Sequence, residues 1–493
     1  MVSLDELKSV TQQVDESENL TFSGKRVLLL QGPVGPFFWT LAKDLRAQGA
    51  CVFKFNFNAG DWLFYQHEAH RFRGNLQDWP EVLKRFILEK KIDAVLLFGD
   101  CRPVHAMVRA MGQEVGFVVG VFEEGYLRPD HVTFEPFGVN GHSKFPQELK
   151  RWIRTGRIKE RVPESLAGAA QEGSPKFCGE ITSTVSQHKV GNTYWHAACW
   201  GMLYFFAAWL GQWFWNNQLH HRKLSIMDAP WWWLSFGRKQ WYRWSERGVQ
   251  AKLTGSLRNQ FFLVPLQVHN DAQITVHSDY ESVCRFIDVV MRSFAAAVQR
   301  VVPSNDPSAS LHGCQLVFKH HPMDRGHRNY AAAIRRLTAR HRLQGRVMYI
   351  HDQHLPSLLK ACRGVVVVNS TTGLSALGHD AAVKVCGTAL YDLPGLTYQG
   401  PLSSFWNEAL NAKPDAEMLM RFKHALLART QLNGSFYRKL EDAPWVCGVM
   451  LEKHLETRLW QARSQASCEV EEKPSVVNSA AVNCEENAEL EQV

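Results

Sequence analysis

Short apolar runs alternate with amphipathic stretches along most of this chain, and the alternation occurs in two separate series. Apolar runs of about four to eight residues predict buried strands, and apolar residues repeated every three or four positions predict helices. In the first series we predict strands at residues 26–31, 51–57, 94–98 and 115–122, and helices at 37–48, 80–90 and 103–111. Strands separated by helices of this length form a parallel, doubly wound sheet.

The second series begins near residue 283. There we predict strands at residues 315–318, 346–350, 364–368 and 383–386, and helices at 283–301, 328–341, 355–362 and 372–379. The predicted fold class is therefore α/β, with two Rossmann-like domains facing each other across a cleft and an aromatic helical insertion. In such sheets ligands bind beyond the carboxyl ends of the strands, so residues that directly follow a strand are the candidates for a functional site.

Changes in composition divide the chain into parts. We predict a loose leader (1–24), an N-terminal Rossmann-like domain (25–159), a linker rich in small residues (160–190), an aromatic helical segment (191–250), a C-terminal Rossmann-like domain (251–445), a closing helix (446–462) and an acidic, disordered tail (463–493). The opening residues lack the basic start and apolar run of a secretory signal, so we expect the protein to remain in the cytoplasm.

The net charge points to an anionic partner. The chain carries +8, and its last thirty residues contribute −6, so the rest carries +14. Such a surface suits phosphate groups, an anionic sugar or a membrane, whereas no motif supports nucleic-acid binding. The eleven cysteines include no Cys-x-x-Cys pair, which favours reduced thiols over a disulfide framework or a zinc site.

Ten of the 17 tryptophans lie between Trp195 and Trp244. Residues 190–219 contain no charged side chain, and a basic cluster follows at 220–223. Three interpretations stay open: docking on a membrane surface, an ordinary helical core, and a membrane span. Basic residues beside tryptophan suit a headgroup region, so we favour docking on the inner-membrane surface as a peripheral protein.

Glycine and polar residues follow the first strands of each series. The loop at residues 31–36 places Gly32 and Gly35 before a helix, where the backbone can approach an anion closely. An ordinary tight turn explains this loop equally well. Asp61 and Gln267 also lie just after apolar runs, and we include both with the two glycines as candidate substrate-binding residues.

Two adjacent carboxylates, Glu123 and Glu124, follow an apolar run. On extended backbone they point to opposite sides, so one faces the cleft while the other holds structure. Arg128 is placed to pair with either carboxylate or with an anionic substrate. The alternative is a solvated surface turn.

Lys319, His321 and Pro322 stand at the end of another predicted strand, where a cation and an imidazole can hold a phosphate. Pro322 directs the chain out of the sheet. A zinc site is the competing interpretation, but no third ligand lies at suitable spacing.

Polar residues also follow the strand at 364–368 and lead into a helix. These are Ser370, Thr371 and Thr372, followed by Gly373. Hydroxyl groups and free N–H groups at a helix N-terminus form an anion cradle. Ordinary helix capping needs only one of these hydroxyls.

In this order, the motifs resemble those of the capsule polysaccharide biosynthesis family of the KpsS type, over roughly residues 25–445. The motifs are QGPVGPFF (31–38), FNFNAGDWLF (55–64), VFEEGYLRPDHVTFEPFGVNG (121–141), an aromatic segment ending in HHR (220–222), FLVPLQVHNDAQI (262–274), VFKHHP (317–322) and NSTTGLSAL (369–377). The ordered set is far more specific than any single motif.

This resemblance implies the GT-B arrangement and a retaining glycosyltransferase. It implies CMP-Kdo as donor (Kdo is an eight-carbon acidic sugar), a phosphatidylglycerol-type lipid or lipid-linked Kdo as acceptor, other capsule assembly proteins as partners, and neither metal nor cofactor. It assigns the cytidylyl phosphate to Lys319, His321, Pro322, Ser370, Thr371 and Gly373, and its FEEG motif falls on Glu123 and Glu124. We add Thr372 to the phosphate-binding candidates and take Glu123, Glu124 and His321 as candidate catalytic residues. The sequence leaves open whether the carboxylate is a nucleophile or an electrostatic stabiliser. The loop holding Gly32 and Gly35 falls on the acceptor side.

Two other functions remain open. A non-catalytic export or scaffold component that binds the lipid-linked glycan would also use the aromatic segment and the basic surface. A sugar-nucleotide epimerase would share the two-domain arrangement but has no need of a lipid-facing segment. Only the enzyme needs the phosphate residues together with Glu123 or Glu124.

Overall fold

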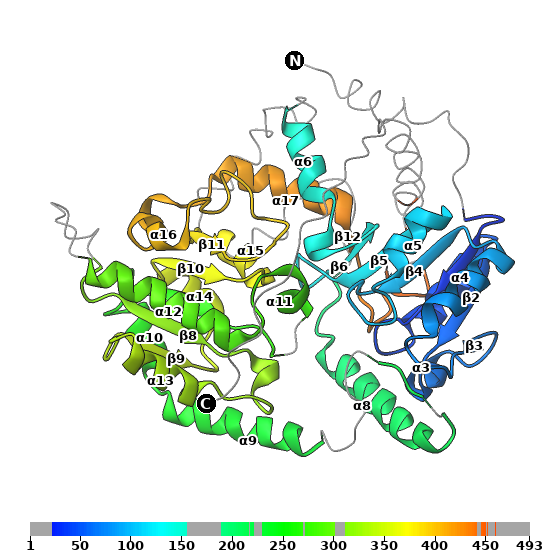
Figure 1. Ribbon diagram of the computed structural model, residues 1–493, viewed down its shortest axis with the longest axis horizontal. Helices are drawn as coiled ribbons and strands as arrows, with labels where there is room; N and C mark the ends of the chain where they lie inside the picture. Colours follow the sequence, from blue (N-terminus) through cyan, green and yellow to red (C-terminus); the bar gives the residue numbers. More distant parts are fainter. Residues whose placement is uncertain are drawn as a thin grey trace, which may run out of the picture.

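The computed structural model describes residues 22–154, 189–215, 217–220, 229–269, 272–300, 311–440, 445–449, 451 and 459. These residues form two α/β units, one built on a seven-stranded sheet and one on a five-stranded sheet (Figure 1). We call them the N-terminal unit and the C-terminal unit. The prediction of two Rossmann-like units with an aromatic helical insertion is confirmed.

The sheet of the N-terminal unit has the strand order β12-β6-β5-β4-β1-β2-β3. Its strands are β1 (Arg26–Leu29), β2 (Cys51–Asn56), β3 (His70–Arg71), β4 (Ala94–Phe98), β5 (Val118–Glu124), β6 (His131–Pro136) and β12 (Gln431–Asn433). Strands β1, β2, β3, β4 and β5 are parallel to one another. Strand β6 is antiparallel to β5, and β12 is antiparallel to β6. The central strands are buried and almost wholly apolar, as expected where helices cover both faces of a sheet.

The helices of this unit are α2 (Phe37–Ala47), α3 (Ala59–Phe64), α4 (Trp79–Lys90) and α5 (Val108–Val115). The last of these begins later than the predicted helix at 103–111, because turns occupy the chain after β4. Gly116 ends α5 in a left-handed conformation, with φ of 91°. Glycine adopts that geometry without strain, which explains why β5 starts three residues later than predicted.

The sheet of the C-terminal unit is wholly parallel, with the order β11-β10-β7-β8-β9. Its strands are β7 (Phe261–Pro265), β8 (Gln315–Lys319), β9 (Val347–Ile350), β10 (Gly364–Val367) and β11 (Val383–Val385). The central strand, β7, is absent from the strands predicted above. Alternate residues of β7 enter two separate cores: Phe261 and Leu263 face one, Phe262 and Val264 the other.

Helices cover both faces of this sheet. They are α11 (Ala272–His277), α12 (Val283–Gln299), α13 (Ala331–Arg340), α14 (Leu355–Ala361), α15 (Thr371–Leu377), α16 (Leu402–Glu408) and α17 (Ala416–Thr430). Residues of α12, α13 and α16 pack on one face, and residues of α14, α15 and α17 on the other. The described chain also forms short 3-10 helices. Those outside the C-terminal unit are η1 (Asn140–His142) and η4 (Gly211–Trp213), and those within it are η6 (Pro322–Asp324) and η7 (Ala409–Asn411).

The chain crosses between the units more than once. Helix α6 (Phe145–Arg154) lies inside the predicted N-terminal domain, yet it packs on α17 and joins the core of the C-terminal unit. After α17 the chain returns, and β12 pairs with β6 so that Gln431 lies opposite Thr133. The return to the N-terminal sheet thus occurs at Gln431, whereas the sequence analysis placed the boundary after residue 445.

Both predicted ends of the folded region differ in detail from the structure. Phe22 falls in the predicted leader but is fully buried in the core of the N-terminal unit. Residues 446–449, predicted as the start of a closing helix, form a turn that ends in a bridge between Gly434 and Val449. Residues 1–21 of the leader and the acidic tail lie outside the described residues, as does most of the linker.

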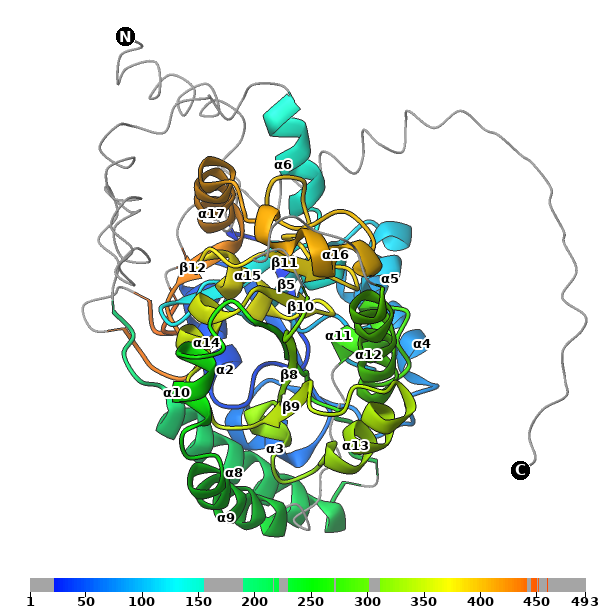
Figure 2. The same ribbon diagram turned by 90° about the vertical axis from the view of Figure 1, so that its left-hand side faces the viewer.

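The aromatic segment forms α8 (Tyr194–Leu210), η4, α9 (Ala229–Ser245) and α10 (Val249–Thr254). Helix α8 packs on α3 of the N-terminal unit. Helix α9 contacts the C-terminal unit, where Arg238 Nη1 donates to the Arg325 carbonyl at 2.7 Å. Figures 1 and 2 show both helices along the same lower edge of the molecule, one beneath each unit.

Candidate functional site

The carboxyl ends of β1, β2, β4 and β5 bring polar side chains together in the N-terminal unit. Gln31, directly after β1, is 1% exposed and lies at their centre. Its Nε2 donates to Asp61 Oδ2 at 3.2 Å and to the Leu219 carbonyl at 3.3 Å, and its Oε1 accepts from Arg102 Nη1 at 3.3 Å. Gln31 therefore links the glycine loop to Asp61 of α3, to Leu219 after η4 and to Arg102 after β4.

The carboxylate of Asp61 is held by three donors. Its Oδ2 accepts from the backbone N–H of Phe57 at 3.0 Å as well as from Gln31, and its Oδ1 accepts from the Tyr204 hydroxyl at 2.8 Å. Its backbone N–H donates to Asn58, the N-cap of α3. Tyr204 belongs to α8, so the aromatic segment is tied directly to this site.

A recess lies beside Asp61, beneath α8. Gly32, Gly35, Lys54 and Tyr204 also line it. Gly35 has φ of +119°, and a Cβ there would lie 3.3 Å from the ring of Trp200 on α8, so glycine allows the loop and the helix to pack closely. Burial lowers the pKa of Lys54 to about 8, with the charge of Asp61 acting in the opposite direction. The predicted residues Gly32, Gly35 and Asp61 therefore share one recess.

Arg102 and His105 fix the loop after β4. Arg102 Nη1 donates to the Gly32 carbonyl at 2.9 Å, and its guanidinium lies 4.7 Å from the ring centre of Phe98. His105 Nε2 accepts from the Gln31 backbone N–H, while its Nδ1 donates to the Gly99 carbonyl at 2.8 Å. Burial lowers the pKa of His105 to about 3, which keeps this imidazole neutral.

The two carboxylates at the end of β5 have different surroundings. Glu124 Oε1 accepts from the hydroxyl of Tyr437 at 3.0 Å, a residue of the returning C-terminal segment. Glu123 Oε1 accepts from the backbone N–H of Glu124 at 3.0 Å, and its other oxygen faces Gly99, beside Arg102. Burial, with a smaller contribution from Glu124, raises the pKa of Glu123 to about 7.

Arg128 makes a local contact: its Nε donates to the Gly125 carbonyl at 3.0 Å. Both carboxylates were candidate partners for Arg128, but Glu124 accepts from Tyr437, and Glu123 accepts from the backbone N–H of Glu124. The side chain of Arg128 is exposed, which leaves the prediction that it contacts an anionic substrate untested.

In the C-terminal unit, Lys319 ends β8 and is only 8% exposed. Its Nζ donates to the His351 carbonyl at 2.9 Å, and burial lowers its pKa. Glu246, at the end of α9, accepts from the His351 backbone N–H at 3.0 Å, and Tyr242 stacks on the His351 ring at 3.5 Å. Helix α9 is thus connected to Lys319 through a single histidine.

The two histidines that follow Lys319 differ. His320 is buried beside the Tyr349 hydroxyl at 2.6 Å, and burial together with His351 lowers its pKa to about 4. His321 caps η6, its Nδ1 accepting from the Met323 backbone N–H at 3.2 Å. Pro322 is the first residue of that 3-10 helix, so it turns the chain out of the sheet as predicted.

Ser370, Thr371, Thr372 and Gly373 lie at the start of α15. Ser370 Oγ accepts from the Thr372 backbone N–H at 3.2 Å, and Thr371 is exposed in the first turn. A Cβ on Gly373 would lie 2.2 Å from the Tyr391 hydroxyl, and that hydroxyl donates to the Ser370 carbonyl. Glycine is therefore needed at this position for packing.

Gln267 connects the ends of neighbouring strands. It follows β7, and its Nε2 donates to Asn369 Oδ1, after β10, at 3.1 Å. Asn369 Nδ2 in turn donates to the His277 carbonyl at 3.3 Å. Because β7 lies between β8 and β10, Gln267 stands between the segments that carry Lys319 and Ser370. Asp271, beyond Gln267 in the same motif, lies outside the described residues.

The sequence analysis missed a cluster at the contact between the units. Cys101 Sγ lies 3.4 Å from Nε2 of His277 on α11, and the His277 ring meets that of His142 with centres 4.4 Å apart. His142 Nδ1 donates to Asp100 Oδ2 at 2.9 Å. Figure 1 shows α11 between the two sheets. These residues come from three separate segments, and only the Gly-Asp-Cys-Arg sequence directly after β4 gave a local signal.

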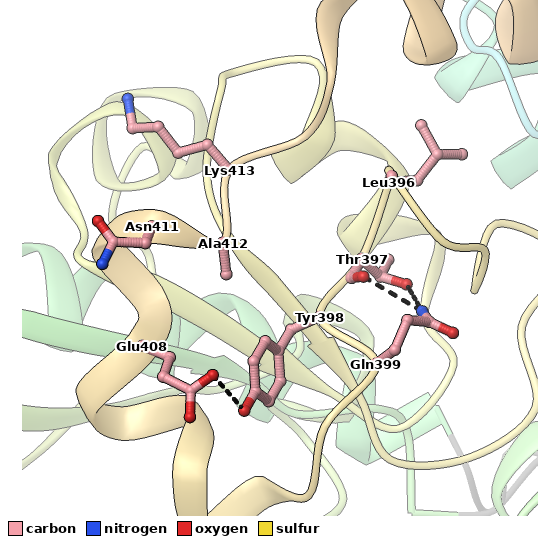
Figure 3. Close-up of a pocket in the computed structure, with 9 residues that line it drawn as sticks. Leu396, Thr397, Tyr398, Gln399, Glu408, Asn411, Ala412 and Lys413 are labelled. Carbon is pink, nitrogen blue, oxygen red and sulfur yellow. Dashed lines mark hydrogen bonds between the residues drawn. The ribbon is translucent and has the colours of Figure 1, made fainter.

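A separate hollow of about 330 Å³ lies on the C-terminal unit, lined by residues 395–399, 408 and 411–413 (Figure 3). The Tyr398 hydroxyl donates to Glu408 Oε2 at 2.9 Å across it, and Gln399 Nε2 donates to Thr397 Oγ1 at 2.8 Å. None of the predicted site residues lines this hollow, so we do not include it in the functional site.

The lower edge of the molecule exposes large apolar side chains. On α8 and η4 they are Tyr194, Trp195, Met202, Leu203, Phe206, Leu210 and Trp213, followed by Phe214, and on α9 they are Leu234, Phe236, Trp241 and Trp244. Such a concentration marks an interaction surface. Among the described helices, none is both long and apolar enough to cross a membrane. Trp231, Trp232 and Trp233 lie in α9, but their side chains are outside the description.

Comparison with known proteins identifies relatives over most of the chain. The family model described as "Capsule polysaccharide biosynthesis protein" matches residues 93–172 and 176–437. The chain is 35% identical over 417 residues to the capsule polysaccharide export protein KpsS of Escherichia coli, an alignment covering 84% of this chain and 97% of that protein. It is 36% identical over 433 residues to the capsule polysaccharide modification protein LipB of Neisseria meningitidis serogroup B, covering 86% and 94%.

Solved structures resemble the chain only distantly. The KpsC β-Kdo 2,7 transferase of Thermosulfurimonas dismutans aligns with 83% of this chain and 99% of that chain, at 13% identity and a TM-score of 0.38. A UDP-N-acetylglucosamine 2-epimerase from Listeria monocytogenes aligns with 92% and 100%, at 13% identity and a TM-score of 0.29. Scores this low carry no argument about activity.

Proposed function

The chain belongs to the capsule polysaccharide biosynthesis protein family, and from that premise we propose that it is a retaining β-Kdo transferase. It moves Kdo from CMP-Kdo to a phosphatidylglycerol-type lipid or to lipid-linked Kdo, building the linker of a capsule polysaccharide. The observation that carries the proposal is the pair of polar sites at the carboxyl ends of the two sheets, in two units that contact each other through α11. The names of the Escherichia coli and Neisseria relatives, capsule export and capsule modification, agree with this role.

The C-terminal unit supplies the donor site. The leaving group is an anionic cytidylyl phosphate, and Lys319, His321 and the N–H groups at the start of α15 offer positive charge and donors to it. Charge fixed in place before the reaction stabilises a developing anion at little cost in reorganisation. In other transferases a metal ion stabilises the leaving phosphate. In the proposed reaction these groups do so, and no metal ion is needed.

The N-terminal unit supplies the acceptor site. To retain the β configuration, the acceptor hydroxyl oxygen attacks the Kdo anomeric carbon from the face that the phosphate leaves. The bond from that carbon to the phosphate oxygen breaks as the bond to the acceptor oxygen forms, and the hydroxyl proton passes to Glu123. A carboxyl group with a pKa near 7 is suited to accept and release a proton at neutral pH. Glu124 holds structure through Tyr437, and the recess containing Gly32, Gly35 and Asp61, with a volume of about 20 Å³, receives a single hydroxyl group of the acceptor.

The lower edge of the molecule docks on the inner membrane. Exposed aromatic side chains on α8 and α9 suit the headgroup region, and Lys239, Arg243 and Arg247 lie on or directly after α9. Asp61 is bonded to α8 through Tyr204 and lines the recess beneath that helix. A lipid acceptor would therefore reach the recess from the surface on which the protein rests.

One experiment tests the proposal. Purified full-length protein is incubated with CMP-Kdo generated in place and a phosphatidylglycerol analogue in vesicles, and the lipid is analysed by mass spectrometry. The proposed function predicts a lipid heavier by one Kdo residue, with a β linkage by NMR. A non-catalytic export or scaffold component predicts binding of lipid-linked glycan and an unchanged lipid, and that result would replace our assignment.

A further inference from the structure

Cys101, His142 and His277 bring together three side chains that are common ligands of soft divalent metals. Each offers one ligand atom, and the three atoms all lie within 4.8 Å of one another. Cys101 follows β4, His142 ends η1, and His277 ends α11. The cluster has no role in the transfer proposed above, and nothing in its sequence spacing predicts a metal site.

The distances suit a small tetrahedral ion after a modest contraction. Zinc binds sulfur at about 2.3 Å and imidazole nitrogen at about 2.0–2.1 Å, which places tetrahedral ligand atoms roughly 3.3–3.7 Å apart. The Cys101 Sγ to His277 Nε2 distance is already 3.4 Å. Only the His142 nitrogen has to move closer, and its side chain is partly exposed.

The surroundings of the cluster have a feature common to metal sites. Ligating histidines usually donate their second ring N–H to a carboxylate, which fixes the ring and raises its basicity. His142 does so through Nδ1, which donates to Asp100 Oδ2 at 2.9 Å, and the ring's other nitrogen is then its ligand atom. Asp100 is 7% exposed and also accepts from the Val139 backbone N–H, so its position is fixed.

Glycines allow the two units to meet at this point. A Cβ on Gly141 would lie 2.4 Å from Nδ1 of His277, and a Cβ on Gly138 would lie 2.9 Å from Asp100 Oδ2. Any larger residue would push α11 away from η1. Cys101 and His142 belong to the N-terminal unit and His277 to the C-terminal unit, so an ion held by all three joins the two.

We propose that Cys101, His142 and His277 bind one soft divalent cation such as Zn²⁺, which links the two units and thereby inhibits transfer. A transferase of this architecture has to open its cleft to exchange substrates, and a metal bond between the units opposes that motion. The binding part of the proposal is independent of the proposed function, whereas the inhibition rests on it.

Cobalt provides the binding test, because a Co²⁺–thiolate bond gives a charge-transfer absorption band. The full-length protein, stripped of metal, is titrated with Co²⁺ and then with Zn²⁺ in competition. We expect one equivalent of Co²⁺ with a thiolate band, displaced by Zn²⁺. The Cys101→Ser variant should lose the band, whereas Cys199→Ser, which removes an exposed thiol of α8, should keep it.

Two further variants test the geometry. His277→Gln should weaken metal binding at least tenfold, and Asp100→Asn should weaken it about tenfold to a hundredfold through His142. Thermal melting of each metal-free variant shows whether it is folded. A band that survives Cys101→Ser, or unchanged affinity in folded His277→Gln, would overturn the site.

The inhibition is measured as the ratio of transfer rates with and without Zn²⁺. We expect at least a tenfold reduction in the wild-type protein, reversed by EDTA, and a ratio near one in Cys101→Ser. Metal binding without inhibition would overturn the regulatory part alone. If no transfer is detected under any condition, the proposed function fails while the cobalt titration still decides the site.

Discussion

In the N-terminal unit, burial raises the pKa of Glu123 to about 7 and that of Glu135 to about 8, whereas two carboxyl groups of the C-terminal unit shift the other way. Burial alone would raise the pKa of Glu246, but hydrogen bonds from His351 and Gln353 outweigh it and lower that pKa. A hydrogen bond from His341 lowers the pKa of Asp288.

This difference separates two kinds of site. Glu123 and Glu135 can gain or lose a proton near neutral pH, as a group that moves protons must. Hydrogen bonds from histidines favour the ionised forms of Glu246 and Asp288, and Lys319 is held in a fixed position, as suits the binding of a fixed negative charge. We therefore expect proton transfer in the first unit and phosphate binding in the second.

The largest expected effect comes from Glu123→Gln. Because the amide cannot accept the acceptor hydroxyl proton, we expect transfer to fall by about 10²–10⁴-fold. Binding of CMP, measured by calorimetry, should stay within about twofold of wild type because the donor site lies in the other unit. Transfer within tenfold of wild type would remove Glu123 from the mechanism.

Glu124→Gln is the matched control for that variant. It weakens only the hydrogen bond from Tyr437, which should cost about 1 kcal/mol of unfolding free energy and leave most of the activity. If both variants lose activity equally, the two carboxylates act together and the division of roles within this site is wrong.

A second prediction concerns the donor site. His321→Ala removes an imidazole that we propose contacts the donor phosphate, and we expect transfer to fall about a hundredfold with weaker CMP binding. The fold should persist, because the side chain contributes a cap to a single 3-10 turn. Circular dichroism and calorimetry check both points. Loss of transfer with unchanged CMP binding would move His321 from phosphate binding to another role.

The raised pKa of Glu135 in the N-terminal unit should make the unfolding free energy depend on pH. Folded Glu135 keeps its proton up to about pH 8, whereas the unfolded chain loses it near the ordinary value of 4.5, so the folded state binds more protons in that window. Stability should therefore fall as the pH rises from about 5 to 8, and Glu135→Gln should remove roughly 3–4 kcal/mol of that decline. Denaturant unfolding at several pH values measures it, and an unchanged slope in the variant would contradict the assignment.

The smallest expected effect compares the two docking helices. We predict that Trp213→Ser with Phe214→Ser, beneath the N-terminal unit, and Trp241→Ser with Trp244→Ser, beneath the C-terminal unit, each weaken binding to anionic vesicles severalfold. Only the first pair should raise the KM for the lipid acceptor by more than it weakens vesicle binding. Trp213 and Phe214 lie just after α8, and α8 lines the proposed acceptor recess through Tyr204. Sedimentation and initial rates measure these quantities. Equal effects of the two pairs on KM would remove this distinction between the helices.

The sequence predicted most of the secondary structure because buried strands and amphipathic helices leave local patterns. The central strand β7 escaped because its five-residue run is short and ends in Pro265, followed by further apolar and polar residues that obscure its end. Strand β12 escaped for a different reason. Gln-Leu-Asn has no strand pattern of its own, and it becomes a strand only because β6 offers an edge for pairing.

The same contrast applies to the sites. Lys319, Pro322 and Ser370 occur where a strand gives way to a turn or a helix, and this local order was enough to select them. Tyr204 and Tyr437 could not be selected, because they reach the N-terminal site from positions far along the chain. Their contacts depend on how α8 and the returning segment pack, which no local pattern encodes.

The position of β12 has a consequence for biosynthesis. Strand β6 ends at Pro136, and its neighbour β12 begins only at Gln431, so almost three hundred residues have to leave the ribosome between them. At about 5–20 residues per second, the nascent N-terminal unit waits on the order of half a minute with the edge of β6 unpaired. An exposed edge of this kind invites pairing with other chains. A chain whose synthesis stops before Gln431 lacks β12, so we expect its N-terminal half to aggregate through the open edge of β6. Translation through Gln431 is therefore needed before the N-terminal unit is complete.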